Sequence, residues 1–349
     1  MTTPILEVAH LCKYFNAGHA ASGETKKLKA VEDVSFAIAP GETMGLVGES
    51  GCGKSTLGRT IVRIHDPTAG RILYKGEDIT QRKNKHLLPV RRSMQMIFQD
   101  PYASLDPRCT VGDILAEPME IHRLYTKRER AARVQALLET VGLKPDHIRR
   151  YPHEFSGGQR QRISIARTLA LDPEFIVCDE PISALDVSIQ AQIINLLERI
   201  QDKRGLSYLF IAHDLGMVRH ISHKIGVMYL GHMMEYGQTA DVYDNPYHPY
   251  TKALLSAVPV PDPKTARAKQ RIVLKGEVFT PIDPPACCLF ATRCPHVMAR
   301  CRRIDPPVCH VAGRRVACHL YTPDFLALRR NGENPIFTDP LGWRADIPV

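Results

Sequence analysis

Apolar and polar residues alternate in several short runs of this chain, and each run predicts a β-strand. Within residues 31–38, Val34, Phe36 and Ile38 alternate with smaller or polar neighbours, the period of two of a half-buried strand. Two later runs, EFIVCDE and SYLFIAHD, are almost continuously apolar. Such runs are typical of parallel strands that are buried on both faces. Shorter strands are predicted at residues 5–9, 71–75 and 94–98.

A helical pattern replaces this alternation between about residues 111 and 171. In KRERAARVQALLETVGL, the apolar side chains recur at i, i+3, i+6, i+7 and i+10. This spacing predicts one buried helix face, made of Ala131, Val134, Leu137, Leu138 and Val141. Gly142 is placed to end that helix. We therefore predict an α/β core with a helical insertion.

The chain of 349 residues is long enough for one large domain and a small one. Residues 1–257 carry the α/β pattern. Six prolines between residues 258 and 286 oppose a continuous helix or a central strand, which predicts a connector. A cysteine-rich segment follows at 287–321, and the tail at 322–349 has little periodicity and no assigned role. No motif is repeated, so the sequence contains no internal repeat.

Composition narrows the class of protein. The chain is 44% apolar and 24% charged, which is ordinary for a folded soluble protein. No apolar run approaches the roughly 18 residues that span a bilayer, and the N-terminus lacks the pattern of a secretory signal. We therefore expect the chain in the cytosol, with any membrane role exerted through partners. Cytosolic thiols stay reduced, which favours metal or cluster ligation over disulfides.

The net charge of +9 suits a phosphate ligand, an anionic lipid or a nucleic acid. Its distribution is uneven, because the segment from Cys287 to Arg330 has eight arginines, two acidic residues and no lysine. The positive charge thus surrounds the cysteines and does not follow a long amphipathic helix.

The stretch GESGCGKS, Gly48 to Ser55, follows an apolar strand and precedes a helix. This is the spacing and context of a phosphate-binding loop, so a chance glycine turn is the weaker interpretation. Its glycines let backbone N–H groups surround phosphates, Lys54 can reach the β- and γ-phosphates, and Ser55 can bind Mg²⁺. The candidate ATP-binding residues here are Gly48, Ser50, Gly51, Gly53, Lys54, Ser55 and Thr56.

Two acidic residues, Asp179 and Glu180, end the buried strand FIVCDE. Ligands of open α/β sheets bind at the carboxyl ends of the strands, so both acids can face the phosphates. We predict that Asp179 orients Mg²⁺ and that Glu180 is the general base for the attacking water. Alone, such a pair could equally be a strand end without a special role.

At FSGGQ, Phe155 to Gln159, the chain resembles the signature motif of ATP-binding-cassette (ABC) ATPases, with Phe155 replacing the usual leucine. The resemblance covers about residues 5–257 and includes seven motifs in the family's order. It implies adenine stacking by Phe15, a Q-loop glutamine at Gln99 that also serves Mg²⁺, and a switch histidine at His213. The D-loop is then Ser183, Ala184, Leu185 and Asp186.

The resemblance implies a P-loop nucleotide-binding domain with a RecA-like core, a β-subdomain and the helical insertion. The glycines of FSGGQ also form a second phosphate cradle at a helix start, and one chain already has its own. In the family, two cassettes form a head-to-tail sandwich around two ATP, which ATP closes and hydrolysis opens. The residues expected to contact the partner's ATP are Phe155, Ser156, Gly157, Gly158 and Gln159.

Longer phrases such as MIFQDPYASLDPR and DNPYHPYTKALLSAVP resemble the ATPase subunits of bacterial dipeptide and oligopeptide importers. The likeness is strongest to the second of their two paralogous ATPases. It implies a heterodimer, two transmembrane permease subunits, an indirect periplasmic binding protein and a peripheral position on the cytoplasmic face of the inner membrane. The permease would dock on the loop from Asp100 to Arg108, with Tyr102 as a candidate contact.

Other functions stay open at this point. The same machinery could import nickel, glutathione or another small solute. A less favoured alternative is an ABC ATPase that acts on nucleic acid or ribosomes, suggested by the basic charge. Such proteins usually carry two cassettes or a long coiled coil, and this chain has neither, so no nucleic acid is expected.

The stretch CCLFATRCP resembles a C-terminal pattern of the same subfamily, with Cys287 in place of the usual glycine. The resemblance implies a [4Fe–4S] cluster held by Cys288, Cys294, Cys301 and Cys318. Wide spacing without C-x2–4-C knuckles also suits a cluster. A zinc site that includes His296, His310 or His319, and reduced thiols without metal, remain alternatives. Cys287 and Cys309 are extra cysteines.

Overall fold

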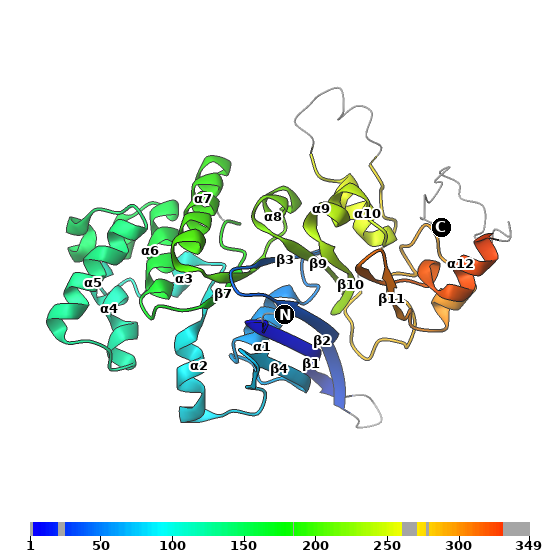
Figure 1. The fold of residues 1–349 in the computed structure, drawn as a ribbon, viewed down its shortest axis with the longest axis horizontal. Helices are drawn as coiled ribbons and strands as arrows, with labels where there is room; N and C mark the ends of the chain where they lie inside the picture. Colours follow the sequence, from blue (N-terminus) through cyan, green and yellow to red (C-terminus); the bar gives the residue numbers. More distant parts are fainter. Residues whose placement is uncertain (1–2, 20–24, 184, 260–270, 277–278, 331–349) are drawn as a thin grey trace.

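The computed structural model describes residues 3–19, 25–183, 185–259, 271–276 and 279–330. The molecule is elongated, with a group of helices (α4, α5 and α6) at one end and the C-terminal elements at the other (Figure 1). A large sheet lies between them. Within the described residues, no helix combines the length and the apolar character needed to cross a bilayer.

The large sheet has eight strands in the order β11-β12-β10-β9-β3-β8-β7-β6. Strands β9, β3, β8, β7 and β6 are parallel, while β10, β12 and β11 run antiparallel to their neighbours. The predicted apolar runs form β7 and β8, which are buried throughout, so that prediction is confirmed. The strands are β3 (Thr43–Val47), β6 (Met94–Ile97), β7 (Phe175–Asp179), β8 (Ser207–Ile211), β9 (Lys224–Tyr229), β10 (His232–Gln238), β11 (Val308–Val311) and β12 (Arg314–Ala317).

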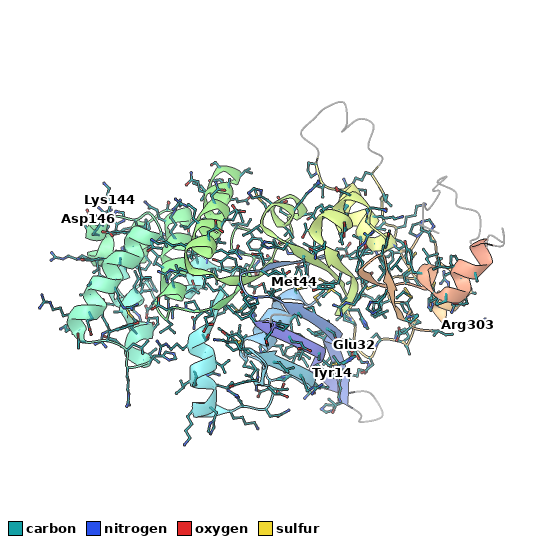
Figure 2. All side chains as sticks on the ribbon, viewed as in Figure 1. Tyr14, Glu32, Met44, Lys144, Asp146 and Arg303 are labelled. Carbon is teal, nitrogen blue, oxygen red and sulfur yellow. The ribbon has the colours of Figure 1, made fainter. Side chains whose placement is uncertain are left out.

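A second, antiparallel sheet has the order β2-β1-β4-β5. Val34, Phe36 and Ile38 are buried as the alternation predicts. One hydrophobic core lies between this sheet, α1 and one face of the large sheet, and it contains the fully buried Met44 (Figure 2). The strands are β1 (Leu6–His19), β2 (Thr25–Ile38), β4 (Ala69–Tyr74) and β5 (Glu77–Asp78).

The helical insertion predicted between residues 111 and 171 is confirmed. It contains α4 (Val111–Ile121), α5 (Lys127–Thr140) and α6 (Gly157–Leu169). Four residues of the predicted α5 face are buried, but Ala131 is exposed. At about 100° per residue, Ala131 lies about 70° from the centre of the other four, outside the buried stripe. Gly142 adopts a left-handed φ of 74° just beyond the helix end, as expected.

A second hydrophobic core joins this insertion to the other face of the large sheet through α6, α7 and α8. The remaining helices are α1 (Lys54–Ile61), α2 (Leu88–Ser93), α3 (Pro101–Ser104), α7 (Val187–Arg204), α8 (Leu215–Ile221), α9 (Thr239–Asp244), α10 (Pro249–Ser256) and α12 (Pro323–Arg330). Short 3₁₀ turns occur at Asn84–Leu87, Pro145–Arg149, Pro152–Glu154, Ala299–Arg302 and His319–Tyr321. Helix α12 lies in the tail, for which the sequence predicts no element.

The connector and the C-terminal segment contact the rest of the chain at several places. Strand β12 pairs with β10 and so extends the large sheet. Phe290 enters an aromatic group with Tyr229 and Tyr250. In the connector, the Lys29 N–H donates to the carbonyl oxygen of Pro281 at 3.0 Å, so the connector lies along β2. Residues 260–270 of the connector and 331–349 of the tail lie outside the described residues.

Candidate functional site

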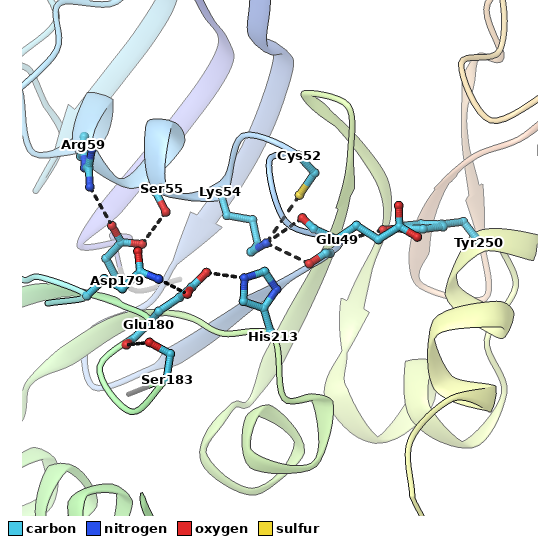
Figure 3. Close-up of polar contacts among 12 residues, drawn as sticks. Glu49, Cys52, Lys54, Ser55, Arg59, Asp179, Glu180, Ser183, His213 and Tyr250 are labelled. Atoms are coloured by element: carbon cyan, nitrogen blue, oxygen red, sulfur yellow. Dashed lines mark hydrogen bonds and ion pairs between the residues drawn. The ribbon is translucent and has the colours of Figure 1, made fainter. Parts of the chain in front are cut away.

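The loop from Gly48 to Ser55 turns tightly between β3 and α1. At Gly53, φ is +104° and a Cβ would lie 2.1 Å from the carbonyl oxygen of Ala30, so only glycine fits. The Lys54 ammonium is buried and donates to the carbonyl oxygens of Gly48 at 2.8 Å and Glu49 at 3.0 Å (Figure 3). The loop is thus preformed, with its lysine directed into the bend.

Asp179, at the end of β7, faces the start of α1. The Ser55 hydroxyl donates to Asp179 Oδ1 at 2.7 Å, and Arg59 Nη2 lies 3.6 Å from Oδ2 (Figure 3). Asp179 is fully buried, and its Oδ2 accepts no hydrogen bond in the structure. A hydroxyl beside a buried, incompletely satisfied carboxylate supplies the oxygen ligands that Mg²⁺ prefers, together with phosphate oxygens.

Glu180 follows Asp179 and is held by two other predicted site residues. Gln99 Nε2 donates to Glu180 Oε2 at 2.7 Å, and His213 Nε2 lies 2.6 Å from Oε1 (Figure 3). Glu180 has a left-handed φ of 48°, which is strained for a residue with a side chain. The structure therefore brings together the three residues that the sequence predicts to be catalytic.

A cleft of about 600 Å³ opens over this group. Phe15 lines it, with its ring edge-on to His65 at a centroid distance of 5.5 Å. The cleft combines an aromatic wall, a phosphate-binding loop and a carboxylate. Its other lining residues from the prediction are Ser50, Gly51, Gly53, Lys54, Ser55, Thr56, Gln99, Glu180 and His213.

The sequence prediction missed one wall of this cleft. Phe279, Thr280 and Pro281 of the connector line it, beside Leu28 of β2 and close to Phe15. The connector is fixed there because Asp283 and Lys27 exchange two hydrogen bonds, of 3.0 and 3.1 Å. Only its prolines signal this segment in the sequence, and they do not reveal what it contacts.

The signature residues start helix α6. Ser156 caps the helix by accepting from the Gln159 N–H, while Gln159 Oε1 accepts from the Ser156 N–H at 3.0 Å. Phe155 is buried against His147, which explains why an aromatic residue can replace leucine there. Among the described residues, none of 155–159 lines the chain's own cleft. The N–H groups of Gly157 and Gly158 therefore belong to a different surface.

The D-loop connects Glu180 to α7. The Ser183 hydroxyl donates to the Glu180 carbonyl oxygen at 3.1 Å, and Asp186 occupies the N-cap of α7. Leu185 packs against the second core. Ala184 lies outside the described residues.

The four predicted cluster ligands lie in one neighbourhood of the C-terminal segment. Burial raises the pKa of Cys288 and of Cys294 to about 12, and it raises the pKa of Cys318 well above its usual value. The charges of Cys294, Cys288 and Cys301 add to the increase at Cys318. In the described part of the chain, no three His, Cys, Asp or Glu side chains converge closely enough to hold a single metal ion.

Comparison with known families finds two family profiles that match this chain. A profile described as "ABC transporter" matches residues 31–183. A second profile, described as "Oligopeptide/dipeptide transporter, C-terminal region", matches residues 234–301. The first contains the glycine-rich loop at 48–55 and both acidic residues, and the second includes most of β10 and the cysteines up to Cys301.

Two relatives match nearly the whole chain. The oligopeptide transport ATP-binding protein AppF of Bacillus subtilis is 54% identical over 91% of this chain and 98% of its own length. The oligopeptide transport ATP-binding protein OppF of Haemophilus influenzae is 51% identical over 87% and 92%. The solved dimeric structure of the ATP-binding cassette MJ0796 bound to ADP and Pi has a TM-score of 0.60 and 25% identity, covering 67% of this chain and 98% of that one.

Proposed function

Because this chain belongs to the ABC transporter family of ATP-binding proteins, we propose that it is the ATP-hydrolysing subunit of a peptide importer. It energises import of dipeptides and oligopeptides through a membrane permease. The observation that carries this proposal is the match of residues 234–301 to the oligopeptide/dipeptide transporter C-terminal region. A generic ABC ATPase profile alone would leave the cargo class open.

In this proposal each site residue has a separate role during ATP hydrolysis. Lys54 exchanges its backbone acceptors for the β- and γ-phosphates, and Ser55 and Asp179 hold Mg²⁺ with help from Gln99. The ion would draw charge from the phosphates. Glu180 accepts the proton of the attacking water, and His213, which lines the cleft 2.6 Å from Glu180, contacts the γ-phosphate.

A second cassette completes each site in this proposal. The chain's own signature does not line its cleft, so the start of α6 is available for the ATP of a partner. A helix N-terminus with a glycine pair favours bound anions. The expected partner is a paralogous ATPase, which gives a heterodimer with two ATP in the interface. ATP closes this sandwich, and hydrolysis reopens it.

The permease surface is expected beside the Q-loop. A groove of about 190 Å³ is lined from β6, α4 and α6 and includes Phe98 and Ile121, both exposed. Tyr102 is 60% exposed, and the Arg160 guanidinium lies 4.1 Å from its ring centroid. Two permease subunits would each engage one ATPase, at the cytoplasmic face of the inner membrane, with a periplasmic binding protein delivering the cargo.

The test is transport by the whole complex. Proteoliposomes with this chain, its paralogue, both permease subunits and the binding protein should take up a labelled peptide only with ATP. Uptake of nickel or glutathione without uptake of peptide would show that the cargo is not a peptide. ATPase activity stimulated by nucleic acid but not by the permease would overturn the importer function.

We further propose that Cys288, Cys294, Cys301 and Cys318 hold a [4Fe–4S] cluster. In a [4Fe–4S] cluster each cysteine binds a different iron, so the ligands lie farther apart than the ligands of one metal ion. Here the four cysteines are near enough to affect the pKa of Cys318, but no three side chains among the described residues could bind one ion. The thiols are buried, and losing their protons is unfavourable unless cations replace them. The cluster would supply folding energy to a short segment. Stoichiometric zinc and reduced thiols are the competing outcomes.

Metal analysis decides among these outcomes. Protein purified without oxygen should be brown and contain about four iron atoms per chain. Cys294→Ser should lose this iron, while the matched Cys309→Ser should retain it, because Cys309 is not among the proposed ligands. One zinc per chain without iron, or no metal at all, would contradict the cluster.

A further inference from the structure

A buried ion pair joins the cysteine-rich segment to the phosphate-binding loop. Arg293 donates to both carboxylate oxygens of Glu49, at 2.7 and 3.0 Å. The Arg293 side chain is only 8% exposed and that of Glu49 27%. Two parallel charge-assisted bonds fix direction as well as distance, so this pair locates the two segments relative to each other.

Glu49 occupies an unexpected place for an acidic residue. It lies directly between Gly48 and Ser50 of the loop whose amides are expected to bind a triphosphate. A carboxylate that turned towards the phosphates would repel them. In the structure the Glu49 side chain extends away from Lys54 and towards Tyr250 (Figure 3), and Glu49 is not among the described residues that line the cleft. The Glu49 backbone N–H donates to the Tyr250 hydroxyl at 2.9 Å.

The surroundings of Arg293 hold it in this position. It lies between Phe290, which packs against Tyr229 and Tyr250, and Cys294. Its guanidinium also reaches the Tyr229 hydroxyl at 3.5 Å. A guanidinium keeps its proton in proteins, so the charge that holds Glu49 is permanent. The anchor is therefore the folded cysteine-rich segment and not a flexible surface side chain.

We propose that Arg293 is a positioning residue for ATP binding: it neutralises Glu49 and holds its carboxylate away from the triphosphate. The folded state of the cysteine-rich segment then sets the affinity of the nucleotide site in the same chain. This inference rests on the proposed ATP binding. It assigns a role in that binding to a residue more than 230 positions from the loop in the sequence.

The experiment measures binding of Mg²⁺ and the non-hydrolysable analogue AMP-PNP by calorimetry. Arg293→Gln should raise Kd about tenfold, because it leaves an unpaired carboxylate beside the phosphates. Glu49→Gln should stay within about threefold of wild type, since it removes that charge. The double variant should return to within about threefold of wild type, which a purely structural role would not produce.

Controls separate this inference from its premise. Arg303→Met, on the exposed turn at the outer end of the segment (Figure 2), should leave Kd and thermal unfolding unchanged. Arg293→Lys keeps the charge but loses the two parallel bonds, so it should weaken AMP-PNP binding by less than Arg293→Gln does. If Arg293→Gln does not fold, Arg293→Lys with and without Glu49→Gln makes the same comparison. A double variant as weak as Arg293→Gln, or an Arg293→Lys variant weakened about tenfold, would overturn the inference. Wild-type protein without AMP-PNP binding would instead contradict the proposed ATPase.

Discussion

Glu180→Gln is expected to lower steady-state ATP hydrolysis by about a hundred- to ten-thousand-fold while ATP binding persists. The carboxylate is the acceptor of the water proton in the proposed mechanism, and an amide cannot accept it. The substitution keeps the shape of the side chain: its amide oxygen can still accept from Gln99, and its NH₂ group can donate to the Nε2 atom of a neutral His213. The surrounding geometry should therefore survive. ATP should then remain trapped in a closed sandwich of two cassettes.

Phosphate release in the assembled transporter measures the rate, and gel filtration with Mg²⁺ and ATP measures trapping. Glu139→Gln, on the exposed face of α5, is the matched control and should hydrolyse ATP normally. Hydrolysis by Glu180→Gln at more than about a tenth of the wild-type rate would remove Glu180 from the role of general base.

Arg314→Leu should lower the free energy of unfolding by about 3–5 kcal/mol, because it leaves a buried carboxylate without its counter-charge. Arg314 Nη1 lies 3.5 Å from Glu235, and the two side chains are 5% and 0% exposed. The guanidinium also covers the Tyr247 ring at 3.6 Å and donates to the Asp241 carbonyl oxygen at 3.0 Å. Burial raises the pKa of Glu235, as expected for a carboxylate that depends on its partners.

Urea unfolding followed by circular dichroism measures this loss as a lower midpoint with an unchanged slope. The exposed Arg302 provides the matched control, and Arg302→Leu should change stability by less than about 0.5 kcal/mol. Adding Glu235→Gln to Arg314→Leu should recover part of the loss, since it removes the unpaired charge. If Arg314→Leu unfolds like wild type, the ion pair does not hold the sheet edge together.

Local patterns of apolar and polar residues were sufficient to predict the central strands and the helical insertion of the fold. Continuous apolar runs identify β7 and β8 because buried parallel strands need apolar side chains on both faces. The buried face of α5 follows from helix geometry, and the one residue predicted wrongly, Ala131, lies outside that face. The prediction failed to extend β2 back to Thr25, because residues 25–30 are mostly polar, none of them is fully buried, and they form a strand by pairing with β1.

The sequence predicted the site residues wherever reactive side chains occur at a recognisable spacing. The phosphate-binding loop and the acidic pair after β7 each lie at strand ends, and the sheet order brings them together. Contacts from distant segments carry no such local signal. Neither the pairing of Arg293 with Glu49 nor the place of Phe279 in the cleft could be read from spacing, because both depend on how the connector folds back along β2.

The pairing of β12 with β10 has a consequence for how this protein can be shortened. Glu235 and Tyr236 face Val316 and Arg315 across the two strands. A chain ending before Cys287 would expose the backbone of β10 and retain Glu235 without Arg314. Unpaired strand edges join other chains, so such a fragment would aggregate instead of behaving as a minimal ATPase. A stable shorter chain must end beyond β12.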